Sequence, residues 1–136
     1  MIIGFSGTRN GMTEVQVTLL EGLLPGKMLR FLHGSCYGAD VEAAQLARTL
    51  FGKRVLIVAY PGIRFGSTTL AAKSNVDDWT MPVEDYLERN RRIVHDCDEL
   101  IACPGEGVSK GTWYTIKYAR KCGKPVTIIH ADGAIE

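Results

Sequence analysis

The sequence lacks the features that mark membrane, secreted and metal-binding proteins. No apolar run approaches the length of a transmembrane helix, and the apolar start at 1–5 is too short for a signal peptide. The four cysteines include no C-x-x-C pair, and the three histidines follow no metal-ligand spacing. A formal net charge of +1 calls for neither nucleic acid nor an anionic membrane as a partner. These absences predict a cytoplasmic protein that makes no membrane contact and needs no metal or other cofactor.

The cysteines are expected to be free thiols, buried or half-buried, in a reducing compartment. They are Cys36, Cys97, Cys103 and Cys122. Cys36 lies in a loop, so a nucleophilic role for its thiol is the alternative interpretation. A zinc site is the least favoured of the three, because the spacing provides no ligand set.

What the sequence does contain is typical of an ordinary globular α/β protein. It has 136 residues, of which 46% are hydrophobic and 23% charged, and this length predicts a single domain with its own core. Short apolar runs alternate with helical patterns. We expect strands at 2–5, 29–32, 54–59, 100–103 and 126–130, and helices at about 13–24, 40–50, 83–96 and 112–122. The alternation predicts a three-layer, Rossmann-like fold: a parallel sheet of about five strands, in the order 3-2-1-4-5, with helices on both faces.

Three glycine-bearing loops, at 6–11, 34–40 and 104–111, are expected to converge at one edge of this sheet. In the predicted strand order, the switch point lies between the first and fourth strands, and ligands of such sheets bind at the carboxyl ends of the strands there. The third loop opens onto the helix expected to begin near Thr112. Free N–H groups and the helix dipole attract an anion at such a helix start. The convergence predicts a pocket for a phosphorylated ligand.

Charged and polar side chains of these loops, and of the helix expected at 83–96, are the candidates for ligand contact. Arg9 and Lys110 could bind phosphate, and Arg89 or Arg91 could reach it, because the planar guanidinium suits phosphate oxygens. Asp40 either caps its helix or accepts a hydrogen bond from a ribose hydroxyl. The predicted ligand-binding residues are Ser6, Gly7, Thr8, Arg9, Gly34, Ser35, Asp40, Arg89, Asn90, Arg91, Pro104, Gly105, Gly107, Ser109, Lys110, Gly111 and Thr112. No catalytic residue and no metal ligand is assigned.

Asn90 falls on the apolar stripe of its helix, so it either pins the backbone of a neighbouring loop or touches the ligand. Arg92 lies four residues after Glu88, a spacing that predicts a surface ion pair between them. The segment 60–82 is too long for an ordinary connection and is predicted to be a lid or binding loop. The alternative is a surface excursion with a short helix near 70–73.

Four aromatic residues have predicted positions as well. Tyr37 and Trp113 could stack on a base. Tyr114 and Tyr118 are four residues apart and are expected to pack together on the outer face of the last helix.

Four segments, in order along the chain, carry a resemblance to a known family. They are SGTRNGMT (6–13), HGSCYGAD (33–40), YLERNRRIV (86–94) and PGEGVSKGTWYTIKYARKCGKPV (104–126). As a set they resemble the SLOG superfamily, which includes DNA-processing protein A (DprA/Smf) and the LOG, or lysine-decarboxylase-like, proteins. The resemblance covers almost the whole chain and is closest to small, stand-alone DprA-like members. It implies a Rossmann-like domain that binds nucleotides, nucleotide-derived signals or single-stranded DNA, usually as a homo-oligomer.

The resemblance also indicates where the chain departs from the catalytic members. LOG enzymes cleave the N-glycosidic bond of nucleoside monophosphates, and their helix arginine matches Arg89. Their P-G-G-x-G-T-x-x-E loop is matched with an insertion before Gly111, and Thr115 stands at the position of the acid. Glycosidic hydrolysis needs a carboxylate. Another carboxylate could take the place of the missing acid, and the candidates are Glu106, Asp40, Glu84 and Glu88.

We therefore predict a protein that binds a nucleotide or nucleotide-derived ligand. The alternatives are a nucleotide N-glycosidase or deoxyribosyltransferase-like enzyme, and DprA-like binding of single-stranded DNA.

Overall fold

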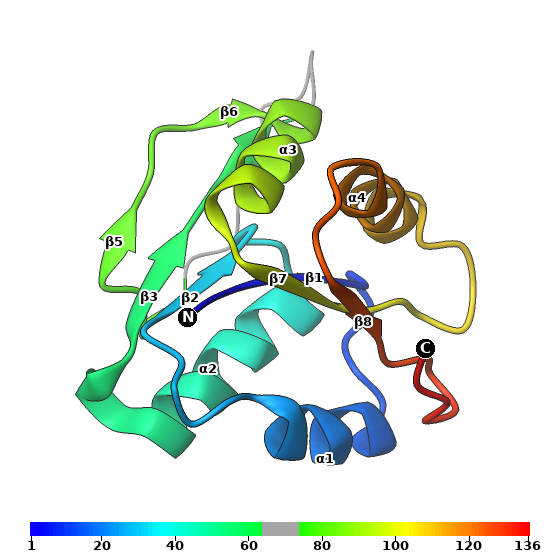
Figure 1. The fold of residues 1–136 in the computed structure, drawn as a ribbon, viewed down its shortest axis with the longest axis horizontal. Coiled ribbons are helices and arrows are strands. Elements are labelled where there is room, and N and C mark those ends of the chain that lie inside the picture. Colours follow the sequence, from blue (N-terminus) through cyan, green and yellow to red (C-terminus); the bar gives the residue numbers. More distant parts are fainter. Residues whose placement is uncertain (64–73) are drawn as a thin grey trace.

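A six-stranded parallel sheet organises the chain (Figure 1). The computed structural model describes residues 1–63 and 74–136. The strand order is β5-β3-β2-β1-β7-β8, and all neighbouring strands are parallel. The strands are β1 (Ile2–Gly7), β2 (Arg30–His33), β3 (Leu56–Ala59), β5 (Trp79–Thr80), β7 (Glu99–Cys103) and β8 (Val126–Ile128). A separate two-stranded ladder joins β4 (Gly62–Ile63) to β6 (Glu84–Asp85).

Helices cover both faces of this sheet, so the fold has three layers (Figure 1). One face carries α1 (Glu14–Leu23) and α2 (Ala39–Phe51), and the opposite face carries α3 (Tyr86–Asp96) and α4 (Lys110–Lys121). A short 3-10 turn, Gly52–Arg54, links α2 to β3. None of the described helices combines the length and the apolar character that crossing a membrane would take.

Small side chains bring α2 close to the sheet. Ala43, Ala44 and Ala47 are fully buried in the same core cluster as Phe5 and Phe31 of the sheet. Alanine adds no bulk at such a contact, so the helix backbone lies near the strands. The first turn of α2 is therefore held directly beneath the carboxyl ends of β1 and β2, where the predicted ligand site lies.

One buried amide ties α1 to the residues that follow the carboxyl ends of β7 and β8. Thr13 and Gln16 form a capping box, as their spacing predicts. The Gln16 Nε2 also donates hydrogen bonds of 2.8 Å to the carbonyls of Pro104 and Ile129, and the side chain is fully buried. Because buried carbonyls need partners, Gln16 fixes the start of the β7–α4 loop against the core.

The predicted strand order is confirmed for five strands, and with it the switch point between β1 and β7. The prediction was incomplete at the sheet edge, where β5 adds a sixth strand beside β3. β5 was missed because it has only two residues, both exposed, within the segment predicted to be a loop. The short helix expected near 70–73 lies outside the described residues.

Candidate functional site

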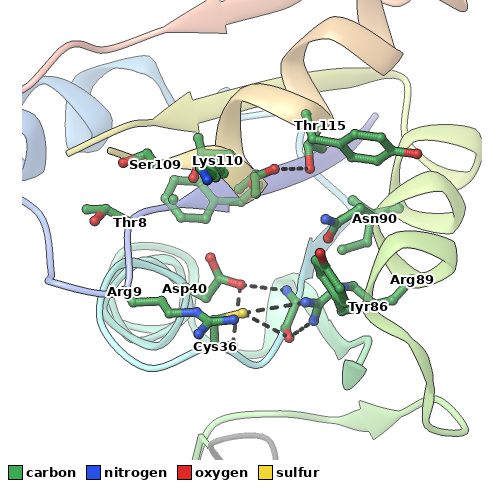
Figure 2. A pocket seen from close by; sticks show the side chains of 18 of the residues that line it. Thr8, Arg9, Cys36, Asp40, Tyr86, Arg89, Asn90, Ser109, Lys110 and Thr115 are labelled. Atoms are coloured by element: carbon green, nitrogen blue, oxygen red, sulfur yellow. Dashed lines mark hydrogen bonds between the residues drawn. The ribbon is translucent and has the colours of Figure 1, made fainter. Parts of the chain in front are cut away.

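A cavity of about 630 Å³ opens at the carboxyl ends of the strands, next to the switch point. Its walls come from the β1–α1 loop, the β2–α2 loop, α3 and the first turns of α4 (Figure 2). Arg9, Cys36 and Asp40 lie on one side, and Ser109, Lys110 and Thr115 on the other (Figure 2). The lining contains three cationic side chains and one carboxylate, Asp40, so its charge suits an anionic ligand.

The structure brings most of the predicted residues together in this cavity. Those that line it are Ser6, Gly7, Thr8, Arg9, Gly34, Asp40, Arg89, Asn90, Ser109, Lys110, Gly111 and Thr112. Those outside its lining are Ser35, Arg91, Pro104, Gly105 and Gly107. All three glycine loops therefore contribute to one pocket, although the third does so through its last residues and not through its glycines at 105 and 107.

Asp40 lies in the first turn of α2 with its carboxylate turned toward the β2–α2 loop. Its Oδ2 accepts hydrogen bonds from the backbone N–H groups of Gly34 (2.9 Å) and Cys36 (3.4 Å). Its Oδ1 is buried and has no partner among the described residues. Burial raises the pKa of Asp40 above its ordinary value, against the opposing influence of His33 and Arg89. The residue that lines the cavity thus contains a buried carboxylate oxygen without a hydrogen-bond partner among the described residues.

Arg89 comes from α3 and reaches across to the same loop. Its NH1 donates to the carbonyls of Gly34 and Tyr60, the latter at 3.0 Å, and its NH2 lies 3.6 Å from the Cys36 Sγ. The side chain is buried, and its Nε has no partner in the described part of the chain. Arg89 therefore holds two loops together, and its side chain, which lines the cavity, keeps one buried donor without an acceptor among the described residues.

Arg91 lies on the outer side of α3, away from the cavity lining. Its Nε donates to the Tyr114 hydroxyl at 2.7 Å, and its NH1 pairs with Glu88 at 3.0 Å. The predicted ion pair between Glu88 and Arg92 is wrong, because Arg92 pairs with Glu84 of β6 at 2.5 Å instead. Helical spacing alone could not foresee that β6 would place a second carboxylate within reach.

The turn that carries Gly34 is shaped by a buried histidine. The Nδ1 of His33 accepts a hydrogen bond from the Ser35 N–H at 3.1 Å, and its Nε2 lies 2.6 Å from the Asp77 Oδ1. Since Nδ1 accepts, Nε2 carries the proton and donates to Asp77. Ser35 is buried with a φ of +54°, a left-handed conformation that tertiary contacts must enforce. Ser35, predicted to bind the ligand, is thus a buried residue of the turn and lies outside the cavity lining.

The start of α4 supplies the third wall. The Ser109 hydroxyl accepts from the Gly105 N–H at 2.9 Å and forms no cap to the helix. Within residues 1–63 and 74–136, the N–H groups of Lys110, Gly111 and Thr112 find no acceptor. Uncapped first-turn N–H groups at the positive end of a helix are suited to an anion.

Cys36 also lines the cavity, and burial raises the pKa of its thiol, with the nearby Asp40 adding to the effect. A raised pKa keeps the sulfur protonated, which argues against the nucleophilic alternative. All four cysteines are free thiols, and Cys122 is exposed where a buried or half-buried position was expected. The described residues contain no cluster of histidine, cysteine and carboxylate side chains able to hold a metal ion.

Asn90 was left open between two roles. Its side chain lines the cavity and is nearly buried, and it forms no hydrogen bond to any described residue.

Of the aromatic candidates, Trp113 packs against the His130 ring and lies outside the cavity lining. Tyr114 and Tyr118 stack as predicted, with ring centroids 6.4 Å apart, but Tyr114 lines the cavity where the outer face of the helix was expected.

Sequence reasoning did not assign several lining residues to the site. They are Phe5, Asn10, Cys36, Tyr86, Leu87, Ile93, Val108, Tyr114 and Thr115. Six of the nine are apolar or aromatic residues, and such residues in a strand, a loop or a helix predict only core packing. Thr115 donates from its hydroxyl to the Gly111 carbonyl at 2.9 Å. Thr115, which the sequence resemblance aligns with the acid of LOG enzymes, therefore places a neutral side chain in the cavity wall.

Fold and cavity together define a three-layer, Rossmann-like α/β protein with a ligand-sized pocket at its switch point. No family model matches the sequence, and the curated proteins contain no detectable relative. Among solved structures, the molybdenum cofactor binding protein from the phototrophic bacterium Rippkaea orientalis is similar, with a TM-score of 0.71 and 23% identity. That likeness covers 95% of this chain and 76% of the other. The structural-genomics target TM1055 is also similar, with a TM-score of 0.64 and 20% identity over 92% of this chain and 70% of that one. These likenesses establish a shared fold.

Proposed function

We propose that the chain binds a nucleotide or nucleotide-derived phosphorylated ligand in the switch-point cavity. The observation that carries the proposal is a pair of buried groups without partners, the Asp40 Oδ1 and the Arg89 Nε, both in residues that line one cavity. Native proteins leave few buried polar groups unsatisfied, because each costs about 1–3 kcal/mol. A ligand with both acceptors and hydroxyl donors would satisfy both.

The distribution of groups suggests how such a ligand lies. Its phosphate would rest on the uncapped start of α4, where Ser109 and Thr112 offer hydroxyls, with Arg9 and Lys110 close by. Neither of those two cations forms an ion pair within the described residues. The sugar would lie toward Asp40, whose free oxygen can accept a hydrogen bond from a ribose hydroxyl.

Two glycines of the third loop provide a matched test. A Cβ at Gly111 or at Gly107 would meet no atom within 4 Å, and neither has a positive φ, so alanine fits at both. Gly111 lines the cavity and Gly107 does not. Gly111→Ala is expected to stabilise α4 by about 0.5–1 kcal/mol and to weaken AMP binding about tenfold, because the methyl group occupies the phosphate position.

Thermal melts and calorimetric titration with AMP would measure the two effects. Gly107→Ala serves as the control and should leave AMP affinity unchanged. Equal loss of affinity in both variants, or loss in Gly107→Ala alone, would move the phosphate to the middle of the loop and away from the helix start.

Membership of the SLOG superfamily remains part of this proposal. Its motifs fall on the three loops and on α3, which are the elements that surround the cavity. That a molybdenum cofactor binding protein shares the fold is in keeping with a small-molecule ligand. Neither point distinguishes a DprA-like member from other members.

An enzyme is the second candidate, because one carboxylate does line the cavity. Of the acids that the sequence left open, Asp40 faces the cavity, whereas Glu84, Glu88 and Glu106 do not line it. A buried carboxyl group with a raised pKa can act as an acid or base in glycosidic cleavage. Incubation with AMP, GMP, CMP and UMP, followed by chromatography of the free bases, tests this. No release from any of the four would exclude the hydrolase.

A further inference from the structure

A second groove, of about 540 Å³, lies beside the switch-point cavity. It runs between residues 9–11 of the β1–α1 loop and the start of α2, where Tyr37, Gly38, Val41 and Glu42 form its other wall. Arg9 and Asn10 line both spaces. The groove and the cavity therefore meet at these two residues, and a ligand that extends past Arg9 would pass from one into the other.

The base of this groove is built from two backbones in direct contact. Gly38 has a φ of +83°, and a Cβ there would lie 2.4 Å from the Arg9 carbonyl oxygen, so no other residue fits. The Ala39 N–H donates to the Thr8 carbonyl at 3.0 Å. On the far side, the Met12 N–H donates to the Glu42 Oε1 at 2.7 Å. These bonds hold the two walls at a fixed separation.

The side chains of the groove favour a flat, uncharged group. Tyr37 is 63% exposed, and its ring is the aromatic surface of the groove. Glu42 places a carboxylate at the far end, which repels phosphate and can accept hydrogen bonds from amino or hydroxyl groups. Arg9, at the junction with the cavity, forms no hydrogen bond or ion pair through its guanidinium with any described residue. The groove therefore adds an aromatic ring and a hydrogen-bond acceptor to the anion site, and the cation Arg9, unpaired among the described residues, lines both spaces.

We propose that the ligand is a dinucleotide: one nucleotide occupies the switch-point cavity, the bridging phosphates lie against Arg9, and the second base stacks on Tyr37. This inference rests on the proposed function, since it needs the first nucleotide in the main cavity. A base offers a π-face for stacking and exocyclic donors for Glu42. A mononucleotide would leave the groove, and the ring of Tyr37, unused.

Calorimetric titration of the full chain with AMP, and with diadenosine diphosphate as the dinucleotide probe, tests the proposal. The dinucleotide should bind about 5- to 150-fold more tightly than AMP, the equivalent of about 1–3 kcal/mol for one stacked base. Tyr37→Ala should remove this gain and leave AMP affinity as it was, whereas Tyr37→Phe, which keeps the ring, should retain it. Trp79→Ala removes an equally exposed aromatic from β5, remote from the groove lining, and is the matched control.

The outcomes separate this inference from the one on which it rests. If AMP binds and the dinucleotide gains nothing, or if Tyr37→Ala weakens AMP and dinucleotide equally, the second subsite is refuted and the nucleotide cavity stands. If neither probe binds, both proposals fail. A third outcome is that an oligothymidylate binds, that its affinity falls in Tyr37→Ala, and that the dinucleotide binds no more tightly than AMP. This outcome would assign the groove to a nucleic acid strand and overturn the proposal.

Discussion

Replacing Arg89 with methionine is expected to lower the free energy of unfolding by about 3–5 kcal/mol and to abolish AMP binding. The guanidinium is buried, its NH1 donates to two carbonyls, and it is the cation that faces the buried Asp40. Methionine fills a similar volume but leaves both carbonyls without their donor and removes the positive charge that acts on Asp40. The side chain also has no room to adjust, because its guanidinium carbon lies 3.0 Å from a Cβ placed on Gly34 and 2.9 Å from one placed on Gly62.

Arg91→Met is the matched control, two residues along the same helix. Its side chain is 42% exposed, and its ion pair with Glu88 is a surface pair, so its loss should cost no more than about 1 kcal/mol. AMP affinity should not change. Urea unfolding curves and calorimetric titrations of the two variants decide the matter. A larger effect on binding from Arg91→Met than from Arg89→Met would contradict the site described above.

Asp40→Asn is expected to change how stability depends on pH. Burial raises the pKa of Asp40 above its ordinary 3.8, so folding favours the protonated carboxyl group. Its favourable contribution is fully present below about pH 4 and is lost as pH rises through the raised pKa. The asparagine variant has no such loss, and its amide oxygen can still accept from Gly34 and Cys36. The stability of the wild type relative to Asp40→Asn should therefore fall as pH increases from 4, measured by urea unfolding at each pH.

The same substitution tests what the free oxygen of Asp40 binds. An amide N–H₂ in place of Oδ1 cannot accept from a ribose hydroxyl, so AMP affinity should fall about 10- to 100-fold, as for a hydrogen bond to a charged group. With 2′,3′-dideoxy-AMP as the probe, wild type and variant should bind alike, because the hydroxyls are absent. An equal loss for both ligands would show that Asp40 acts on the loop and not on the sugar.

The arrangement of the sheet was predictable because its signals are local and repeated. RVLIVA at 54–59 reads as a buried parallel strand, and the Thr13–Gln16 capping box and the glycine loops mark where helices begin and end. The alternation of strands and helices along the chain then allows only a few topologies for the sheet. β5 escaped this reasoning because two exposed residues carry no periodicity, and its place beside β3 depends on tertiary contacts.

Within the site, the loops were predictable and the individual side chains were not. Arg89 and Arg91 are separated by about 200° around α3. The apolar stripe runs through Asn90, which lies midway between them, so the helical pattern places both arginines equally close to the buried face. Only the position of Gly34, in the β2–α2 loop, decides which arginine becomes buried. The left-handed Ser35 has a similar origin, since the His33–Asp77 pair that shapes its turn joins residues far apart in sequence.

The direct contact of two backbones at Gly38 bears on the kinetics of binding. Loops that must close over a ligand slow its association and lose conformational entropy when they become ordered. Here the β1–α1 loop and the start of α2 are already joined, by the Ala39–Thr8 hydrogen bond and by the Arg9 carbonyl lying against Gly38. These two walls are preorganised. Differences in affinity among ligands that touch them should therefore appear mainly as differences in residence time, with association rates that stay nearly constant.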